Sequence, residues 1–338
     1  ADLPRPTGGR AMSPYARRRT RLPPRPGPAA PFFAARGLWH PPRRVAELRE
    51  RSIIAADGTR VAYRIGGGGP ALILCNGITT SHFFWTHLEP RWLRRFTVVE
   101  WDLKGHGRSE PAKTAEGVTM PALAGDALAV LDAERISQAV FVGFSMGCQV
   151  ALEAYRRAPG RVRGLVLLLG PAGRVFDTAL GPVGPLLHRL IAAMPGLGFA
   201  AAFRVVRRIV GMRGSYRLGQ LLRLIGPAAT RADVQLYIDH FLRDVDASTL
   251  AAMALAAQDH DAGDLLPRIT APTLIVAGDR DVFAPTDRVG SQMHRAIRGS
   301  ELLRLPAGTH TSLFEHAAEI GGAVEGFCER NWPRERAS

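Results

Sequence analysis

Residues 139–147 read Ala-Val-Phe-Val-Gly-Phe-Ser-Met-Gly, and this stretch decides the fold. Its first half is a short apolar run, which is typical of a strand buried on both faces. Its second half has the pattern G-x-S-x-G, with Gly143 and Gly147 on either side of Ser145. Glycines at these positions give a sharp strand-to-helix turn the room to hold a serine hydroxyl clear of the sheet edge. The stretch therefore predicts a strand, a tight turn that presents Ser145, and a helix over 146–158.

Similar short apolar runs with turn residues beside them occur on both sides of this stretch. Including residues 139–143, the predicted strands are residues 52–56, 59–65, 71–75, 97–101, 139–143, 162–169, 273–277 and 301–305. Helices are expected near 121–134, 146–158, 286–297 and 313–330. Strands that alternate with helices predict an α/β fold, in which a mostly parallel eight-stranded sheet carries helices on both faces.

Residues 172–262 interrupt this alternation. They contain no convincing strand and several apolar helical faces, one formed by Leu218, Leu221 and Leu222. We interpret this segment as a helical cap inserted between the sixth and seventh strands. The core is then residues 52–171 and 263–330. Arg204, Arg207 and Arg208 are expected on the solvated outer side of a cap helix, without stable membrane insertion.

The net charge of +14 is concentrated at the N-terminus. Residues 1–51 contain twelve arginines and three acidic residues, which accounts for +9 of it. Residues 1–48 are rich in Pro, Arg and Gly and have little apolar periodicity, so we expect a disordered tail. Because no basic stripe is interleaved with aromatic residues, nucleic-acid binding is not expected.

The three cysteines, Cys75, Cys148 and Cys328, are widely spaced and match no metal-ligand pattern. An odd number of scattered cysteines favours a reducing compartment. Every apolar run is interrupted before the roughly 18 residues that a membrane span needs, and no apolar segment typical of a secretory signal follows the arginines near residue 18. These features predict a cytoplasmic protein without a transmembrane helix.

A serine hydroxyl is a poor nucleophile unless a base takes its proton. Of the ten histidines, His310 lies in a loop between a late strand and a helix, whereas His316 falls within the helix. His106 follows the 97–101 strand and is expected to shape a loop near the site. A carboxylate should orient the base. Asp281 follows the 273–277 strand and is preferred to Asp279, which suits a turn or capping role.

Attack on a carbonyl group also needs hydrogen-bond donors for the oxyanion. The backbone N–H of Met146 is one expected donor. The second should come from the loop after the 71–75 strand, where Ile78 is the first choice and Thr79 the alternative. We also expect Asn76, Thr79 and Phe144 to bind substrate.

With these residues assembled, the chain resembles the α/β-hydrolase superfamily, in the serine-nucleophile branch with a helical cap after strand 6. The resemblance covers about residues 52–330. It rests on segments in family order, namely Asn76-Gly77, residues 102–109, 143–147, 271–274 and 278–285, and His310. One position departs from the family, because Asn76-Gly77 stands where His-Gly is common. Asparagine tolerates left-handed backbone angles, so the loop should keep its shape.

The resemblance implies a serine hydrolase that cleaves an ester, thioester or lactone through an acyl-enzyme on Ser145. No metal or cofactor is expected, and the partner is a small-molecule substrate. Apolar cap residues including Leu186, Leu190 and Leu222 suggest a hydrophobic acyl group. Two alternatives stay open, a lyase or perhydrolase that uses the same residues and a ligand-binding protein on the same fold.

Overall fold

The computed structural model describes residues 47–194, 196–212 and 214–333. The tail expected over residues 1–48 lies outside these ranges except for Glu47 and Leu48, so its disorder stays a prediction.

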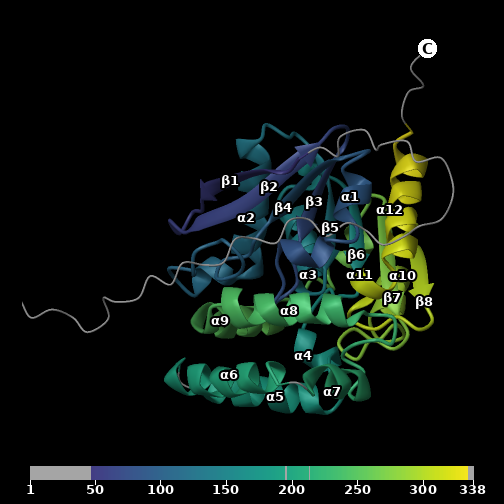
Figure 1. Cartoon of the computed structure of the whole chain (residues 1–338). Coiled ribbons are helices and arrows are strands. Elements are labelled where there is room, and N and C mark those ends of the chain that lie inside the picture. The colour runs from purple at the N-terminus through teal and green to yellow at the C-terminus, as the bar shows by residue number, and fades with distance from the viewer. Residues whose placement is uncertain (1–46, 195, 213, 334–338) are drawn as a thin grey trace, which may run out of the picture. The chain divides into compact units, whose positions relative to one another are not determined.

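The centre of the fold is an eight-stranded sheet with the order β1-β2-β4-β3-β5-β6-β7-β8 (Figure 1). The two antiparallel pairs are β1 with β2 and β2 with β4, and all other neighbours are parallel. The strands are β1 Arg49–Ile54, β2 Arg60–Gly67, β3 Ala71–Cys75, β4 Thr97–Trp101, β5 Ala139–Phe144, β6 Val162–Leu168, β7 Thr273–Gly278 and β8 Glu301–Leu305. The mostly parallel eight-stranded sheet predicted from sequence is confirmed.

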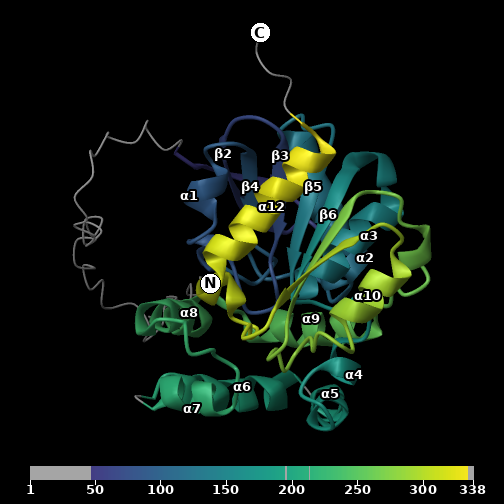
Figure 2. The same ribbon diagram turned by 90° about the vertical axis from the view of Figure 1, so that its right-hand side faces the viewer.

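The sheet is buried on both faces because alternate side chains of its central strands enter different cores. In β5, Val140 and Val142 pack on one side, where η1 (His82–Trp85), α1 (Glu89–Trp92) and α12 (Ala317–Asn331) lie. Phe141 packs on the other side, that of α2 (Met120–Ala133) and α3 (Met146–Arg157). Figure 2 shows helices on both sides of the sheet. The strands read as continuous apolar runs for this reason.

The helices of the core follow the strands as a doubly covered sheet requires. They are α1 Glu89–Trp92, α2 Met120–Ala133, α3 Met146–Arg157, α10 Gly290–Ala296, α11 Ser312–Glu315 and α12 Ala317–Asn331, with the short 3₁₀ helices η1 His82–Trp85, η2 Glu116–Val118, η3 Pro159–Arg161 and η4 Leu266–Arg268.

Several boundaries differ from the prediction by a few residues; for example, α10 begins at Gly290 rather than near residue 286. β1 begins at Arg49 rather than at residue 52, because the hairpin register continues to the pair Arg49 and Ile65. The helix expected over 313–330 is divided at His316, whose φ of −121° and ψ of 29° are not helical. The loop that carries His310 therefore ends in a separate short helix.

In the part of the insertion that the structure describes, six α-helices lie between β6 and β7, in addition to η4. They are α4 Val175–Thr178, α5 Val183–Ala193, α6 Gly196–Val210, α7 Ser215–Leu221, α8 Arg231–Asp244 and α9 Ala247–Asp259. Thr230 and Asp233 form a capping box at the start of α8, and Asp246 caps α9. Helices are present where the cap was expected, while their role as a cap and the division of the chain at residues 172 and 262 stay predictions.

Candidate active site

Ser145 stands at the turn between β5 and α3. Its backbone has a φ of 54° and a ψ of −122°, and α3 begins at the next residue. Such a left-handed φ is strained for serine and persists only where the surrounding structure holds it. A Cβ on Gly147 would lie 2.0 Å from the carbonyl oxygen of Cys75, and one on Gly143 would lie 2.3 Å from the carbonyl oxygen of Gly147. The close approach of these backbones is the physical reason for both glycines.

His310 joins Ser145 to Asp281. Its Nε2 lies 3.0 Å from Ser145 Oγ, and its Nδ1 lies 2.9 Å from Asp281 Oδ2. The other carboxylate oxygen of Asp281 accepts hydrogen bonds from the amides of Phe283 at 2.8 Å and Ala284 at 3.0 Å. Because both oxygens are engaged and the Asp281 side chain is fully buried, the carboxylate has one orientation. A continuous chain of hydrogen bonds therefore runs from a buried carboxylate to a serine hydroxyl.

The alternative acid and base candidates lie in other environments. Asp279 contacts the guanidinium of Arg304 at 3.0 Å, on the surface. His316 lies at the start of α12 and contacts Glu319 at 3.4 Å. The structure thus brings together Ser145, Asp281 and His310 rather than either alternative.

Aromatic rings hold the imidazole of His310. The ring of Phe144 lies 5.1 Å from it and that of Phe283 lies 4.7 Å from it, between ring centroids. Phe144 also packs against Phe84 at 4.6 Å and is buried. Phe144, which was expected to bind substrate, therefore packs beside the base and has little surface left for a ligand.

Asn76 was also expected to bind substrate, and the structure gives its side chain a different task. The side chain is completely buried. Its Nδ2 donates to the carbonyl oxygen of Trp101 at 2.6 Å, and its Oδ1 accepts from Trp85 Nε1 at 2.7 Å. Both ends of the amide are engaged, so Asn76 fixes the loop after β3 and its side chain has no free group for substrate.

The same loop carries Ile78 and Thr79, the two candidates for the second oxyanion donor beside Met146. The amide of Thr79 donates to His106 Nε2 at 3.1 Å, and Thr79 has a left-handed φ of 66°. In the part of the chain that the structure describes, the amides of Ile78 and Met146 donate to no protein acceptor. This difference favours Ile78 over Thr79 as the second donor.

His106 has a role that the sequence indicated only as shaping a nearby loop. The residue is completely buried, and its Nδ1 lies 3.0 Å from the carbonyl oxygen of Lys104. An imidazole that donates from Nδ1 and accepts at Nε2 is neutral. Burial lowers the pKa of His106, which preserves this state. His106 therefore links the loop after β4 to the candidate oxyanion loop after β3.

Tyr237 of α8 contacts this loop from the inserted helices. Its hydroxyl lies 2.8 Å from Thr79 Oγ1. Burial raises the pKa of Tyr237, so the phenol stays neutral. No local pattern in the sequence indicates this contact, because the two residues lie far apart in the chain and nothing in the helical pattern of α8 marks one face as meeting Thr79.

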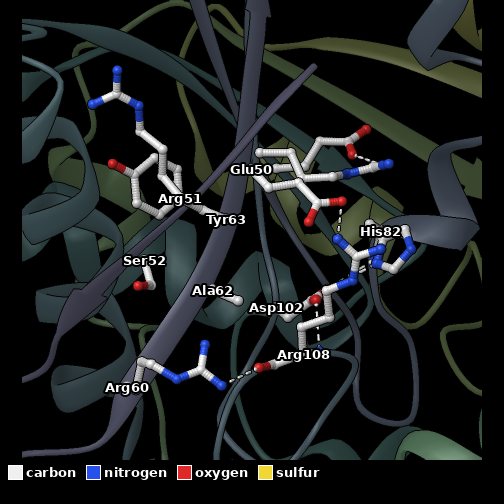
Figure 3. Close-up of a pocket in the computed structure, with 11 residues that line it drawn as sticks. Glu50, Arg51, Ser52, Arg60, Ala62, Tyr63, His82, Asp102 and Arg108 are labelled. Carbon is white, nitrogen blue, oxygen red and sulfur yellow. Dashed lines mark hydrogen bonds and ion pairs between the residues drawn. The ribbon is translucent and has the colours of Figure 1, made fainter. Parts of the chain in front are cut away.

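One pocket borders the candidate site, and another lies over a different part of the sheet. The first, of about 360 Å³, borders Asp281 but is not lined by Ser145 or His310. Its lining includes apolar Leu222 and Val282 and charged Arg223 and Arg280. The other, of about 250 Å³, lies over β1, β2 and β4 and does not include Ser145 (Figure 3).

The second pocket is lined by charged groups that pair with one another. His82 contacts Asp102 at 3.4 Å, and Arg64 contacts the buried Glu100. Burial raises the pKa of Glu100 to about 8 even with Arg64 beside it. These pairs hold the edge of the sheet together, and the pocket is not part of the Ser145 site.

Within the described residues, no cluster of three or more His, Cys, Asp or Glu side chains could hold a metal ion. In the same part of the chain, no helix is both long and apolar enough to cross a membrane.

A family model described as the alpha/beta hydrolase fold matches residues 70–201. The crystal structure of a hydrolase from Pseudomonas aeruginosa superimposes with a TM-score of 0.66, at 27% identity, over 82% of this chain and 97% of that one. The chain has the α/β-hydrolase fold.

The chain is also similar to curated proteins. It is 28% identical to a pimeloyl-[acyl-carrier protein] methyl ester esterase from Neisseria meningitidis, over 83% of this chain and 98% of that protein. An uncharacterized protein from Mycobacterium tuberculosis is also 28% identical, over 82% of this chain and 81% of that protein. The enol-lactonase of Burkholderia xenovorans, at 24% identity and a TM-score of 0.65 over 82% of this chain and 99% of that one, shares the fold.

Proposed function

We propose that this α/β hydrolase cleaves a carboxylic ester, thioester or lactone through an acyl-enzyme on Ser145. The observation that carries the proposal is the hydrogen-bonded chain from Asp281 through His310 to Ser145, with distances of 2.9 and 3.0 Å. A nucleophile and a base within hydrogen-bonding distance, with the base oriented by a third group, are the signature of nucleophilic catalysis.

In this mechanism Ser145 Oγ attacks the carbonyl carbon while His310 Nε2 accepts its proton. Asp281 holds the proton on Nδ1 and stabilises the imidazolium that forms. The amides of Met146 and Ile78 donate to the developing oxyanion, since neither has a protein acceptor in the described structure. His310 then returns the proton to the leaving group, and water, activated by the same imidazole, releases the acyl group.

Two observations support the substrate class. Similarity to the pimeloyl-[acyl-carrier protein] methyl ester esterase supports an enzyme of the carboxylic ester hydrolase type. The pocket that borders Asp281 has both apolar side chains, including Leu222 and Val282, and charged ones, including Arg280, which suits a small-molecule substrate with an apolar and a polar part. Leu186 and Leu190, which the sequence suggested as part of an apolar site, are instead 57% and 48% exposed.

The test is hydrolysis of p-nitrophenyl esters from acetate to a long acyl chain by the full-length protein and by Ser145→Ala. We expect kcat/KM of the variant to fall by about 10⁴-fold or more, because the oxyanion donors and binding alone leave only residual catalysis. Ser52→Ala, which changes an exposed serine of β1, is the matched control and should keep full activity.

Covalent labelling by a fluorophosphonate separates the remaining functions. If Ser145 is labelled but no ester, thioester or lactone is hydrolysed, the acyl-hydrolase proposal fails and a lyase or perhydrolase is favoured. If Ser145 is not labelled either, its hydroxyl is not activated and a ligand-binding protein on this fold is favoured.

A further inference from the structure

The exposed large hydrophobic side chains of this protein are concentrated in the inserted helices. In the described structure one such side chain, Ile54, lies in β1, and all the others fall between residues 183 and 222. They are Val183, Leu186, Leu190, Met194, Val205, Val206, Ile209, Met212, Leu218, Leu221 and Leu222. Single exposed hydrophobic residues are ordinary, but so many on neighbouring helices mark an interaction surface.

These side chains belong to one layer. Figures 1 and 2 both show α5, α6 and α7 on the far side of α8 and α9 from the sheet. The inner side of this layer is well packed, since Phe203 lies 5.3 Å from Phe241 between ring centroids and is buried. Arg207 also donates to the carbonyl oxygens of Phe241 and Val245. The helices are therefore fixed from the inside, and their apolar outer side chains are left without a partner. We call this outer side of α5, α6 and α7 the cap face.

The charge of the same segment has one sign. Residues 178–232 contain eight arginines and no Asp, Glu or Lys. Six of these arginines are exposed and form no ion pair with a described carboxylate, namely Arg189, Arg204, Arg208, Arg217, Arg223 and Arg231 of α8. A cap face that combines exposed aliphatic side chains with uncompensated arginines has the composition of helices that lie in a membrane interface.

We propose that the cap face docks on a bilayer that contains anionic phospholipids. The aliphatic side chains enter the boundary between head groups and acyl chains, and the long arginine side chains extend to the phosphate groups. This arrangement needs no spanning helix. Of the arginines expected on the solvated outer side, Arg204 and Arg208 are exposed, whereas Arg207 turns inward to backbone carbonyl groups.

Two other occupants fit the cap face less well. A second copy of the chain would bring two arginine-rich, acid-free faces together, and the like charges would repel each other. A nucleic acid would satisfy the arginines but leave the aliphatic side chains without an apolar environment. The proposal does not depend on the reaction at Ser145, because binding is measured without turnover.

The experiment is flotation of the full-length protein with vesicles of phosphatidylcholine alone or with about 30% phosphatidylglycerol. One variant, L186S/I209S/L221S, removes apolar area and keeps every arginine. A second, R204Q/R208Q/R217Q/R223Q, removes charge and keeps the apolar side chains. Their matched controls outside the cap face are I54S and R94Q/R157Q/R295Q/R298Q, which change exposed residues of the core. Circular dichroism checks that each variant is folded.

We expect the wild-type protein to bind the anionic vesicles and each cap variant to bind at least about tenfold more weakly, with both controls within about twofold of wild type. The arginines of residues 1–46 are present in every protein, so binding through them would leave the cap variants unchanged and would overturn the proposal. Wild-type protein that stays unbound would also overturn it. The proposal would also be overturned if the wild-type protein were a dimer that the L186S/I209S/L221S substitutions dissociate, with no vesicle binding. It would likewise be overturned if the protein bound RNA as tightly as vesicles and the apolar substitutions left RNA binding unchanged.

Discussion

Replacing His106 by leucine tests whether the candidate oxyanion loop depends on the loop after β4. Leucine has neither the Nε2 acceptor for the Thr79 amide nor the Nδ1 donor for the Lys104 carbonyl. Each buried group left without a partner costs about 1–3 kcal/mol, so we expect the free energy of unfolding to fall by about 2–6 kcal/mol. Thr79, whose φ is 66°, also loses one of the contacts that hold it in this strained conformation.

The effect on catalysis should exceed a general loss of stability. Movement of Thr79 displaces the neighbouring Ile78 amide, and loss of an oxyanion donor costs at most about 10²–10³ in kcat. We expect His106→Leu to lower kcat for a p-nitrophenyl ester within this limit and to change KM little. His106→Gln restores an acceptor near Nε2 and should recover most of kcat. His294→Leu, which changes an exposed histidine of α10, is the control.

A pH series of urea denaturation gives a second test of His106. Because burial lowers its folded pKa, the unfolded chain binds a proton near the ordinary histidine pKa of about 6.5 while the folded chain does not. The difference in free energy of unfolding between the wild type and His106→Gln is therefore largest above about pH 6.5 and decreases as the pH falls. If folded His106→Leu keeps the kcat of the wild type, or if leucine and glutamine variants lose kcat equally, the loop does not depend on this imidazole and our reasoning is wrong.

Two further substitutions test the carboxylate of the site and the buried ion pairs of the core. In Asp281→Asn the amide NH₂ faces His310 Nδ1 and favours the tautomer with the wrong nitrogen protonated. We therefore expect kcat to fall by about 10⁴-fold, while the free energy of unfolding measured in urea changes little. Retention of more than about a tenth of the wild-type kcat would contradict the role of Asp281. Lys104 Nζ lies 3.1 Å from Asp57 and 3.0 Å from Asp126, and all three side chains are nearly buried. Lys104→Met should therefore lower the free energy of unfolding by about 3–5 kcal/mol at pH 8. Burial raises the pKa of Asp126 to about 6, and loss of the lysine raises it further. At pH 5 the Asp126 carboxyl of the variant is therefore neutral, and Lys104→Met lowers the free energy of unfolding by less than it does at pH 8. An equal cost at both pH values would refute that account.

The sheet could be predicted from sequence because strands buried on both faces leave continuous apolar runs. The candidate triad followed from the same logic, since loops at the carboxyl ends of parallel strands meet at one edge. Ser145, Asp281 and His310 each lie in such a loop, and the structure brings their side chains within hydrogen-bonding distance.

The remainder depends on contacts between distant parts of the chain. No local pattern shows that Asn76 turns inward to Trp85 and Trp101, or that Tyr237 reaches Thr79. Periodicity found the apolar faces of α6 and α7, but it cannot tell whether another element covers such a face. The exposure of Leu221 and its neighbours therefore became visible only in the folded chain.

The position of the inserted helices has a consequence for how this protein can diverge. The chain leaves the sheet after Leu168 and returns at Thr273, yet β6 and β7 are adjacent strands in which Leu165 pairs with Thr273. The whole insertion thus bridges a single step between neighbouring strands. Because the entropy of closing a loop grows only with the logarithm of its length, doubling this segment would cost about 0.6 kcal/mol. Natural variation or a chimera can therefore exchange the insertion for one of another length and surface, and retune what reaches Ser145, while the sheet beneath keeps its register.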